Sequence, residues 1–184
     1  MKKVLFVLIL SFFFISSINA QQGKMHIGAG LELALPIGDW SDAASTGIGG
    51  TARFEYQFAP KIVGMLTAGY ISFGGQEFGG IDWSYSAIPF LPGVKYFFQP
   101  GLYGMAELGL HFFSVEFDSP TFNIGGVSYG GGSTSDTQTE FTLALGAGYE
   151  TQISDNLYLD ANVKFAIVSD ANYLGARVGV KMPL

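Results

Sequence analysis

The sequence predicts an all-β fold, an eight-stranded antiparallel up-and-down barrel that spans a membrane. Apolar residues recur at every second position along several segments, and polar or charged residues fill the positions between them. Glycine and aromatic residues are abundant, with 26 Gly, 17 Phe and 9 Tyr. Beyond the N-terminal run, no stretch approaches the roughly 18 consecutive apolar residues of a membrane helix. A chain that crosses lipid without such helices must close into a barrel, because every backbone polar group needs a partner there.

The last two segments, 157–168 and 174–184, show the alternation most clearly. Every second residue from Leu157 to Ile167 is apolar, and the same holds from Leu174 to Leu184. A period of two places these residues on one face of a strand and the intervening residues on the other. We therefore expect one face toward lipid and the other toward a polar lumen.

The first 20 residues are expected to be removed before folding. Lys2 and Lys3 precede an apolar run over 4–15, and Ala20 supplies a small residue at the cleavage point. The run is shorter than the roughly 20 residues that a membrane helix needs. This pattern predicts a secretory signal peptide over 1–20, with cleavage before Gln21, and one barrel domain over 21–184.

The composition excludes several classes of function. The net charge is −6 and the lysines are scattered, so no basic patch for nucleic acid is expected. The chain contains no cysteine, which excludes disulfides and thiolate chemistry. We expect no cofactor.

Eight strands are expected in order along the chain. Their approximate ranges are 24–35, 47–58, 62–73, 83–98, 102–115, 137–151, 157–168 and 174–184. In the third range both faces are apolar or small, so its faces stay unassigned. Pro89 and Pro92 cannot donate to a ladder, which predicts a bulge or irregular pairing in the fourth range.

The connections alternate between long loops and short turns. Loops are expected over 36–46, 74–82 and 116–136, and tight turns over 59–61, 99–101 and 154–156. This asymmetry is typical of outer-membrane barrels, and it predicts loops outside and both termini in the periplasm. Aromatic residues near both ends of the strands are expected to form girdles at the membrane interfaces. These residues are Phe58, Phe98 and Tyr149 at the turns and Phe73, Trp83 and Phe112 at the loops.

No catalytic or metal site emerges from the residue pattern. His26 and His111 are both expected in the lumen, and Ser114 is the nearest candidate nucleophile. Residues 111 and 114 lie on opposite faces of a strand, whereas a nucleophile and its base must be within hydrogen-bond reach. The glycine-rich segments 28–30 and 47–50 precede no helical periodicity, so they do not match phosphate-binding loops.

The charged residues on the polar faces are the most specific feature. An eight-stranded barrel is just wide enough for side chains to fill, so a near-balance of charge predicts ion pairs that close the lumen. Pairing across the last turn places Asp160 opposite Lys181 and Lys164 opposite Arg177. Because that second pair is repulsive, we expect flanking acids, so that Glu140, Lys164, Arg177, Glu32 and Arg53 form one buried network at similar height. With the attractive pair Asp160–Lys181, the expected lumen ion network comprises Glu32, Arg53, Glu140, Asp160, Lys164, Arg177 and Lys181.

Three segments resemble strands of a known family. Residues 86–98, with Ile-Pro followed by Lys-Tyr-Phe-Phe, residues 102–109 and residues 179–181 are similar to strands of the OmpA/OmpX-like barrels of Gram-negative envelopes. The resemblance implies an eight-stranded barrel in the outer membrane. Its expected partners are outer-membrane lipid and the outer-membrane assembly machinery, and it is expected to be a monomer. The chain ends in Leu184, where such chains usually end in an aromatic residue.

These observations predict a non-enzymatic outer-membrane protein that serves envelope integrity or presents surface loops to an unknown partner. The alternatives are an outer-membrane lipid-modifying enzyme and a small gated pore. A soluble ligand-binding barrel would instead show an apolar lumen and a polar exterior.

Overall fold

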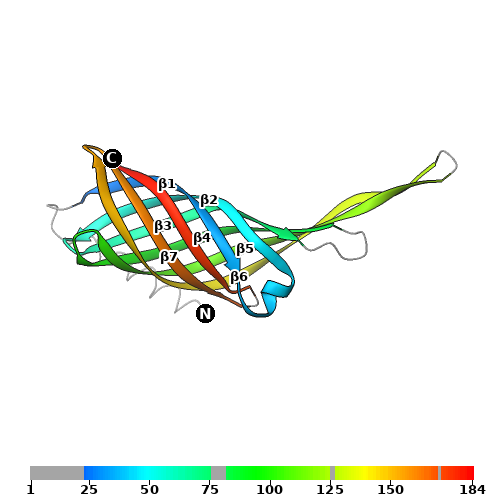
Figure 1. Cartoon of the computed structure of the whole chain (residues 1–184), viewed down its shortest axis with the longest axis horizontal. Helices are drawn as coiled ribbons and strands as arrows, with labels where there is room; N and C mark the ends of the chain where they lie inside the picture. The colour runs from blue at the N-terminus through cyan, green and yellow to red at the C-terminus, as the bar shows by residue number, and fades with distance from the viewer. Residues whose placement is uncertain (1–22, 76–81, 125–126, 170) are drawn as a thin grey trace, which may run out of the picture.

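The computed structural model describes residues 23–75, 82–124, 127–169 and 171–184. Eight antiparallel strands close into one barrel in sequence order, and β8 pairs with β1 (Figure 1). The predicted fold class is therefore confirmed. No helix among the described residues is long and apolar enough to cross a membrane. The strands are β1 (Met25–Pro36), β2 (Ala44–Ala59), β3 (Ile62–Gly75), β4 (Asp82–Gln99), β5 (Leu102–Ile124), β6 (Val127–Ser154), β7 (Leu157–Val168) and β8 (Tyr173–Pro183).

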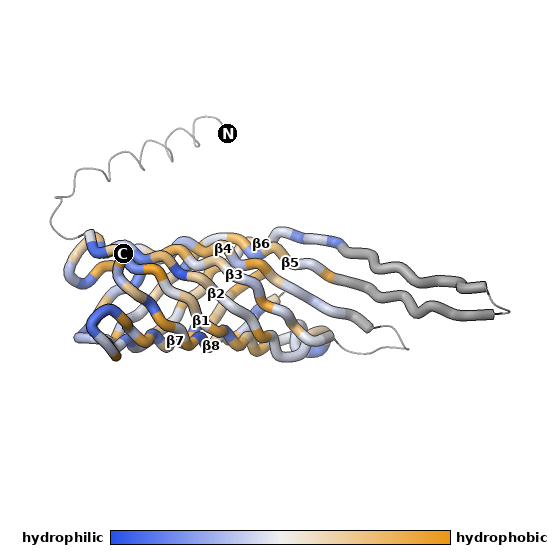
Figure 2. Tube along the Cα trace, turned by 90° about the horizontal axis from the view of Figure 1, so that it is seen from above, coloured by the Kyte–Doolittle hydropathy of each residue, from blue (hydrophilic) through white to orange (hydrophobic). Residues whose placement is uncertain are grey.

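The outer surface of the barrel is apolar and its interior holds the charges. Leu31 on β1 is 72% exposed, whereas its neighbour Glu32 is fully buried. Figure 2 shows the resulting mixture of hydrophobic and hydrophilic residues along every strand. On β3, which the sequence left unassigned, Thr67 is buried and Tyr70 is exposed, so its odd-numbered residues face the lumen. This arrangement excludes the soluble-barrel alternative, which requires the opposite polarity.

The two prolines of β4 interrupt pairing without a bulge. Pairing with β3 skips the positions around Pro89, and pairing with β5 skips the positions around Pro92. The register on either side of each gap is the same. Each proline lacks an N–H, so one ladder bond is lost while the strand continues. The irregular pairing predicted for β4 is present.

One end of the barrel consists of short turns, and we call it the turn end. Register shifts occur just before each turn, between Gln57 and Ala59, between Phe97 and Gln99, and between Gln152 and Ser154. Gly101 has a φ of +82°, which suits glycine in a tight turn. The C-terminus lies at this end, where the Leu184 N–H donates to the Met25 carbonyl at 3.0 Å.

The opposite end carries a long hairpin where the sequence predicted a loop over 116–136. Strands β5 and β6 pair without a register shift from Leu102–Tyr149 to Ile124–Val127. Figure 1 shows this hairpin reaching far beyond the other strands. The loop prediction was wrong because it relied on the Gly/Ser-rich composition. Backbone hydrogen bonds form a ladder whatever the side chains, and only Pro120 interrupts it over the described pairs.

The expected loop over 36–46 is also partly structured. Residues Gly38–Asp42 form the short 3₁₀ helix η2, and β2 begins at Ala44. Gly38 has a φ of +71°, and its carbonyl accepts a hydrogen bond from Ser41 Oγ at 2.7 Å. Figure 1 shows η2 at the ends of β1 and β2, and its Trp40 packs against Phe73 of β3, so the segment stays close to the barrel.

The pairing of β7 with β8 differs by two residues from the prediction. Lys164 lies opposite Gly175 rather than Arg177, and Asp160 lies opposite Gly179 rather than Lys181. The connection is wider than a tight turn because Asn172 caps the end of β7: its Oδ1 accepts the Val168 N–H at 2.9 Å. The Asn172 carbonyl accepts the Ile37 N–H at 2.9 Å, which draws the connection toward β1.

Candidate functional site

The lumen at the turn end is filled by five acidic and five basic side chains, which we call the charged layer. All are almost fully buried except Glu150, whose side chain is 15% exposed. Their formal charges cancel, so the layer is neutral as a whole. Its members are Glu32, Arg53, Glu55, Lys95, Glu107, Glu150, Asp160, Lys164, Arg177 and Lys181.

Asp160 on β7 is the central acceptor of the charged layer. Its Oδ1 lies 3.0 Å from Nη1 of Arg177 and 3.4 Å from Nη1 of Arg53. Its Oδ2 lies 2.8 Å from Lys95 Nζ and accepts the Tyr103 hydroxyl at 2.8 Å. Both oxygens are thus satisfied by charge-assisted hydrogen bonds, which are the stronger class.

Two lysines join three carboxylates at the turn end. Lys95 Nζ contacts Glu55 Oε1 at 2.5 Å and Glu150 Oε2 at 3.4 Å, in addition to Asp160. Lys181 Nζ lies 2.6 Å from Glu55 Oε2 and from Glu150 Oε2. The three carboxylates lie close enough together to suggest a cation site. The two ammonium groups already occupy the space between them, so the cluster is a set of ion pairs.

Lys164 sits higher in the charged layer, toward the hairpin end. Its Nζ lies 2.8 Å from Glu32 Oε1 and 3.5 Å from Glu107 Oε2. Thr67 Oγ1 donates to Glu107 Oε1 at 2.7 Å and accepts from Arg53 Nε at 3.1 Å. These contacts join Lys164 to the rest of the layer, since Arg53 also reaches Glu107.

The structure brings together all the expected network residues except Glu140. The β6–β7 register places Gly146 opposite Lys164, and Glu140 lies six residues further along β6. At about 3.3 Å per residue, that separation is roughly 20 Å. The expected network left out Glu55, Glu107 and Glu150, the other three acids of the charged layer. It included Glu140 instead, because strand adjacency alone does not give height along the barrel.

Glycines on neighbouring strands make room for the long charged side chains. A Cβ at Gly146 would lie 2.9 Å from the Cβ of Lys164, and one at Gly175 would lie 3.1 Å from Lys164 Cγ. A Cβ at Gly30 would lie 2.9 Å from Arg177 Cζ. The side chains of Lys164 and Arg177 pass over these glycines on the inner wall of the barrel. A larger residue at those positions would collide with them, so the glycine pattern is part of the site.

The lumen toward the hairpin end is filled by a second set of residues, the apolar layer. Trp40, from η2, inserts into it and packs against Phe73 and Phe113, with ring centroids 4.6 and 5.7 Å apart. The layer comprises Ala34, Trp40, Ala44, Ile71, Phe73, Ala87, Phe113, Ala144, Ala166, Val168, Ala171 and Tyr173. Phe73 is 1% exposed and faces the lumen, so its predicted place in an interfacial girdle was wrong.

The predicted girdle residues at the turn end are exposed on the outer surface, as a girdle requires, whereas those predicted at the loop end are not all exposed there. Phe58, Phe98 and Tyr149 are 42%, 61% and 53% exposed on the outer surface. Phe112 is half-buried, and the side chain of Trp83 lies outside the described part of the structure.

His111 lies between the two layers and is fully buried. Its ring nitrogens hydrogen-bond to Thr142 Oγ1 at 2.7 Å and to the Tyr173 hydroxyl at 3.0 Å. Its ring stacks on Phe113. Ser114, the candidate nucleophile, instead bonds Thr137 Oγ1 at 2.9 Å on an exposed face. The two residues do not form a catalytic pair.

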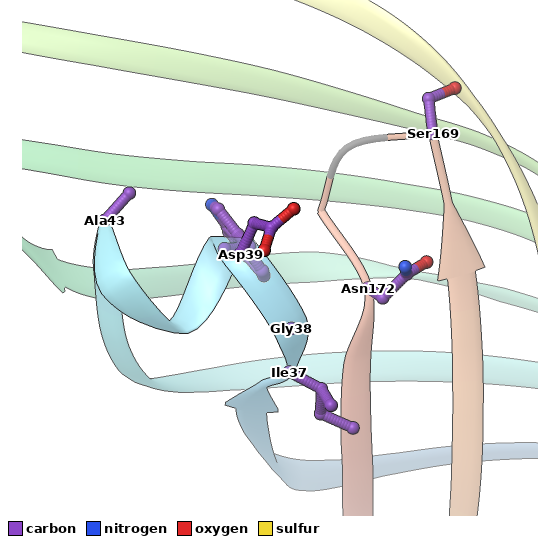
Figure 3. A pocket seen from close by; sticks show the side chains of 7 residues that line it. Ile37, Gly38, Asp39, Ala43, Ser169 and Asn172 are labelled. Carbon is purple, nitrogen blue, oxygen red and sulfur yellow. The ribbon is translucent and has the colours of Figure 1, made fainter.

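A small pocket lies beside Trp40 at the hairpin end. It is bordered by η2 on one side and by the β7–β8 connection on the other (Figure 3). Asp39 on η2 and Asn172 on the connection lie on opposite sides of it, and the Asn172 side chain points away from Asp39, toward β7 (Figure 3). It is a surface hollow above the apolar layer.

The model of the outer membrane protein beta-barrel domain matches residues 5–182 of the chain. The chain belongs to this family. It is therefore an outer-membrane protein, as its exterior and strand lengths indicate. No curated protein sequence matches it.

Solved structures with the same fold share little sequence with the chain. Ail, the attachment invasion locus protein of Yersinia pestis, is 17% identical, with 89% of this chain and 100% of that chain covered and a TM-score of 0.64. A major outer membrane protein from Thermus thermophilus is 13% identical, with 88% and 99% covered and a TM-score of 0.68. Neisserial surface protein A is 14% identical, with 87% and 97% covered and a TM-score of 0.53.

Proposed function

We propose that this outer-membrane barrel is non-enzymatic, closed to solutes, and serves to hold the β5–β6 hairpin clear of the membrane for contact with a partner. The hairpin itself is the observation that carries the proposal. Beyond the last β6–β7 pair, Thr142–Val168, β6 continues to Val127. At about 3.3 Å per residue, this extension is roughly 50 Å long.

The filled lumen supports a closed barrel over a gated pore. Ion pairs of the charged layer join non-adjacent strands, such as Arg53 on β2 with Glu107 on β5. The apolar layer with Trp40 forms a second obstruction nearer the hairpin. A solute would need both layers to rearrange, which would separate buried charges from their partners at a considerable cost in free energy.

The placement of the polar side chains supports a non-enzymatic role. A lipid-modifying enzyme needs a nucleophile and base that its substrate can reach. His111 is fully buried with both ring nitrogens engaged, and Ser114 points away from it.

The proposed orientation places the hairpin outside the cell and the short turns and C-terminus in the periplasm. Long connections on the outer side are typical of outer-membrane barrels. The C-terminus and the three tight turns share one end, opposite the hairpin (Figure 1).

The test is protease treatment of intact cells. Cleavage is expected within 116–135, leaving the barrel in the membrane with heat-modifiable migration on an unboiled gel. As a matched control, residues 117–134 are replaced by Asn-Gly, a two-residue hairpin turn. This variant is expected to fold and to resist the protease. Cleavage of the wild type only after the envelope is opened would refute the proposed orientation.

A further inference from the structure

Within the described part of the chain, the outer edge of β6 has no strand beside it over the fifteen residues 127–141. Pairing with β7 stops at Thr142–Val168, and no other described strand pairs with that edge from Val127 to Phe141. An unpaired strand edge presents a row of backbone donors and acceptors, which is a template for another strand.

The donors on this edge are identified by the register of the hairpin. The Glu150 N–H donates to the Gly101 carbonyl at 2.9 Å, toward β5. The β5–β6 register does not shift along the hairpin, so even-numbered residues of β6 direct their N–H groups to β5. The odd-numbered residues from Val127 to Phe141 therefore direct theirs to the free edge.

Among the described strands, the outer edge of β5 is covered by β4 over most of its length and is free only over residues 119–124, a stretch that contains a proline. Strand β5 pairs with β4 as far as Asp118, and Pro120 follows two residues later. Proline, lysine and bulges are the usual protection of exposed edges. Residues 127–141 contain neither proline nor lysine, and the β5–β6 ladder shows no bulge there.

The charge at the hairpin end favours a cationic occupant for this edge. From Gln21 onward, every lysine and arginine lies in the charged layer or near the turn end, as Lys24 and Lys61 do. A second copy of this chain would bring like charges together, which disfavours self-association. Among the described residues, the charged residues of the hairpin and of the connections at the hairpin end are all acidic: Asp39, Asp42, Asp82, Glu116, Asp118, Asp136 and Glu140.

We propose that the free edge of β6, from Val127 to Phe141, binds an extended cationic polypeptide segment by β-strand addition. Main-chain hydrogen bonds to the edge supply the affinity, and the acidic surroundings steer the segment to it. The inference rests on the proposed function in treating the hairpin as the contact element, but its test does not depend on the orientation in the cell.

The experiment measures peptide binding to the full chain in lipid nanodiscs at low ionic strength. The probes are a ten-residue peptide of alternating lysine and threonine, the same peptide with glutamate in place of lysine, and the lysine peptide N-methylated at alternate residues. The test variant is Ser133→Pro/Thr137→Pro, which removes two outward N–H groups and leaves the β5–β6 ladder intact. The matched control, Ser133→Val/Thr137→Val, keeps both N–H groups.

Binding of the lysine peptide is expected to weaken at least about tenfold in the proline variant and to stay within about twofold in the valine control. The glutamate and N-methylated peptides are expected to bind at least about tenfold more weakly, and added salt should reduce binding. Equal binding to the proline variant, or equal binding of the glutamate peptide, would overturn the proposal. A nanodisc dimer that only the proline variant loses would assign the edge to a second copy and also overturn it. Because nanodiscs expose both faces, failure here leaves the whole-cell protease test of the proposed function unaffected.

Discussion

Lys95 on β4 and Asp160 on β7 meet across the lumen, with Lys95 Nζ 2.8 Å from Asp160 Oδ2. Strands β5 and β6 separate β4 from β7 around the barrel, so this ion pair joins opposite walls. Lys181 on β8 and Glu55 on β2, which β1 separates, form a shorter link, with Lys181 Nζ 2.6 Å from Glu55 Oε2. The barrel is thus held closed by side chains that cross it as well as by its backbone ladder.

Asp160→Asn is expected to destabilise the barrel by about 3–5 kcal/mol, because it leaves buried cations without their shared acceptor. The measurement is urea unfolding in lipid vesicles. Glu140→Gln serves as the control, since Glu140 lies outside the charged layer, and surface-like changes are usually within about 0.5 kcal/mol. Similar losses in the two variants would show that the charged layer contributes nothing specific.

Gly146→Ala is expected to lower the free energy of unfolding by about 1–3 kcal/mol, as overpacking does. The new Cβ would collide with the Val163 carbonyl oxygen and would lie 2.9 Å from the Lys164 Cβ. At Gly50 a Cβ meets nothing within 4 Å, so Gly50→Ala should be neutral or stabilise by up to about 1 kcal/mol through the unfolded state. The same unfolding titration compares the two, and an equal loss would exclude crowding against Val163 and Lys164 of β7 as the cause.

Val163→Arg tests the lipid face of β7, where Val163 is 55% exposed near the middle of the strand. An arginine at the bilayer midplane costs about 2–4 kcal/mol, falling to about 0–1 kcal/mol near the interface. The control is Ile153→Arg, which places the same charge beside the β6–β7 turn. If unfolding from vesicles gives equal costs, the depth assignment is wrong.

Trp40→Ala is expected to open the apolar layer to reagents from the hairpin side. Because the chain has no cysteine, Ala166→Cys provides a single reporter at a fully buried position of that layer. A membrane-impermeant maleimide should leave this cysteine unmodified when Trp40 is present and label it in the Trp40→Ala background. Ser41→Cys, on the exposed face of η2, should react in both backgrounds. Labelling of residue 166 that does not depend on Trp40 would show that the tryptophan does not seal the mouth.

Most of the barrel can be predicted from the sequence because apolar and polar residues alternate along each strand. This period of two shows which side chains face lipid and which face the lumen. Glu32, Arg53 and Asp160 lie in the lumen as that period requires. The register between neighbouring strands is harder to predict from the sequence, because it depends on the length and conformation of the connection that joins them. The cap that Asn172 provides to Val168 widens the last connection and shifts the pairing by two residues.

The β5–β6 hairpin and the insertion of Trp40 into the lumen could not be predicted from the pattern of side chains. The hairpin is built from backbone pairing through a Gly/Ser-rich segment, where side chains carry little signal. Trp40 follows a glycine with positive φ, and its insertion into the lumen depends on contact with Phe73 and Phe113 from distant strands. A tryptophan flanked by Gly38-Asp39 and Ser41-Asp42 is a weak signal for a folded connection.

Conductance across a planar lipid bilayer tests the closed lumen most directly. The full-length folded protein, added at neutral pH in molar potassium chloride, is expected to give no stepwise conductance. An engineered barrel carrying Trp40→Ala, Lys95→Ala and Asp160→Ala, which shortens one side chain of the apolar layer and two of the charged layer, should give measurable steps if it folds, as heat-modifiable migration would verify. Steady steps of solute-permeable size from the unaltered protein would contradict the account.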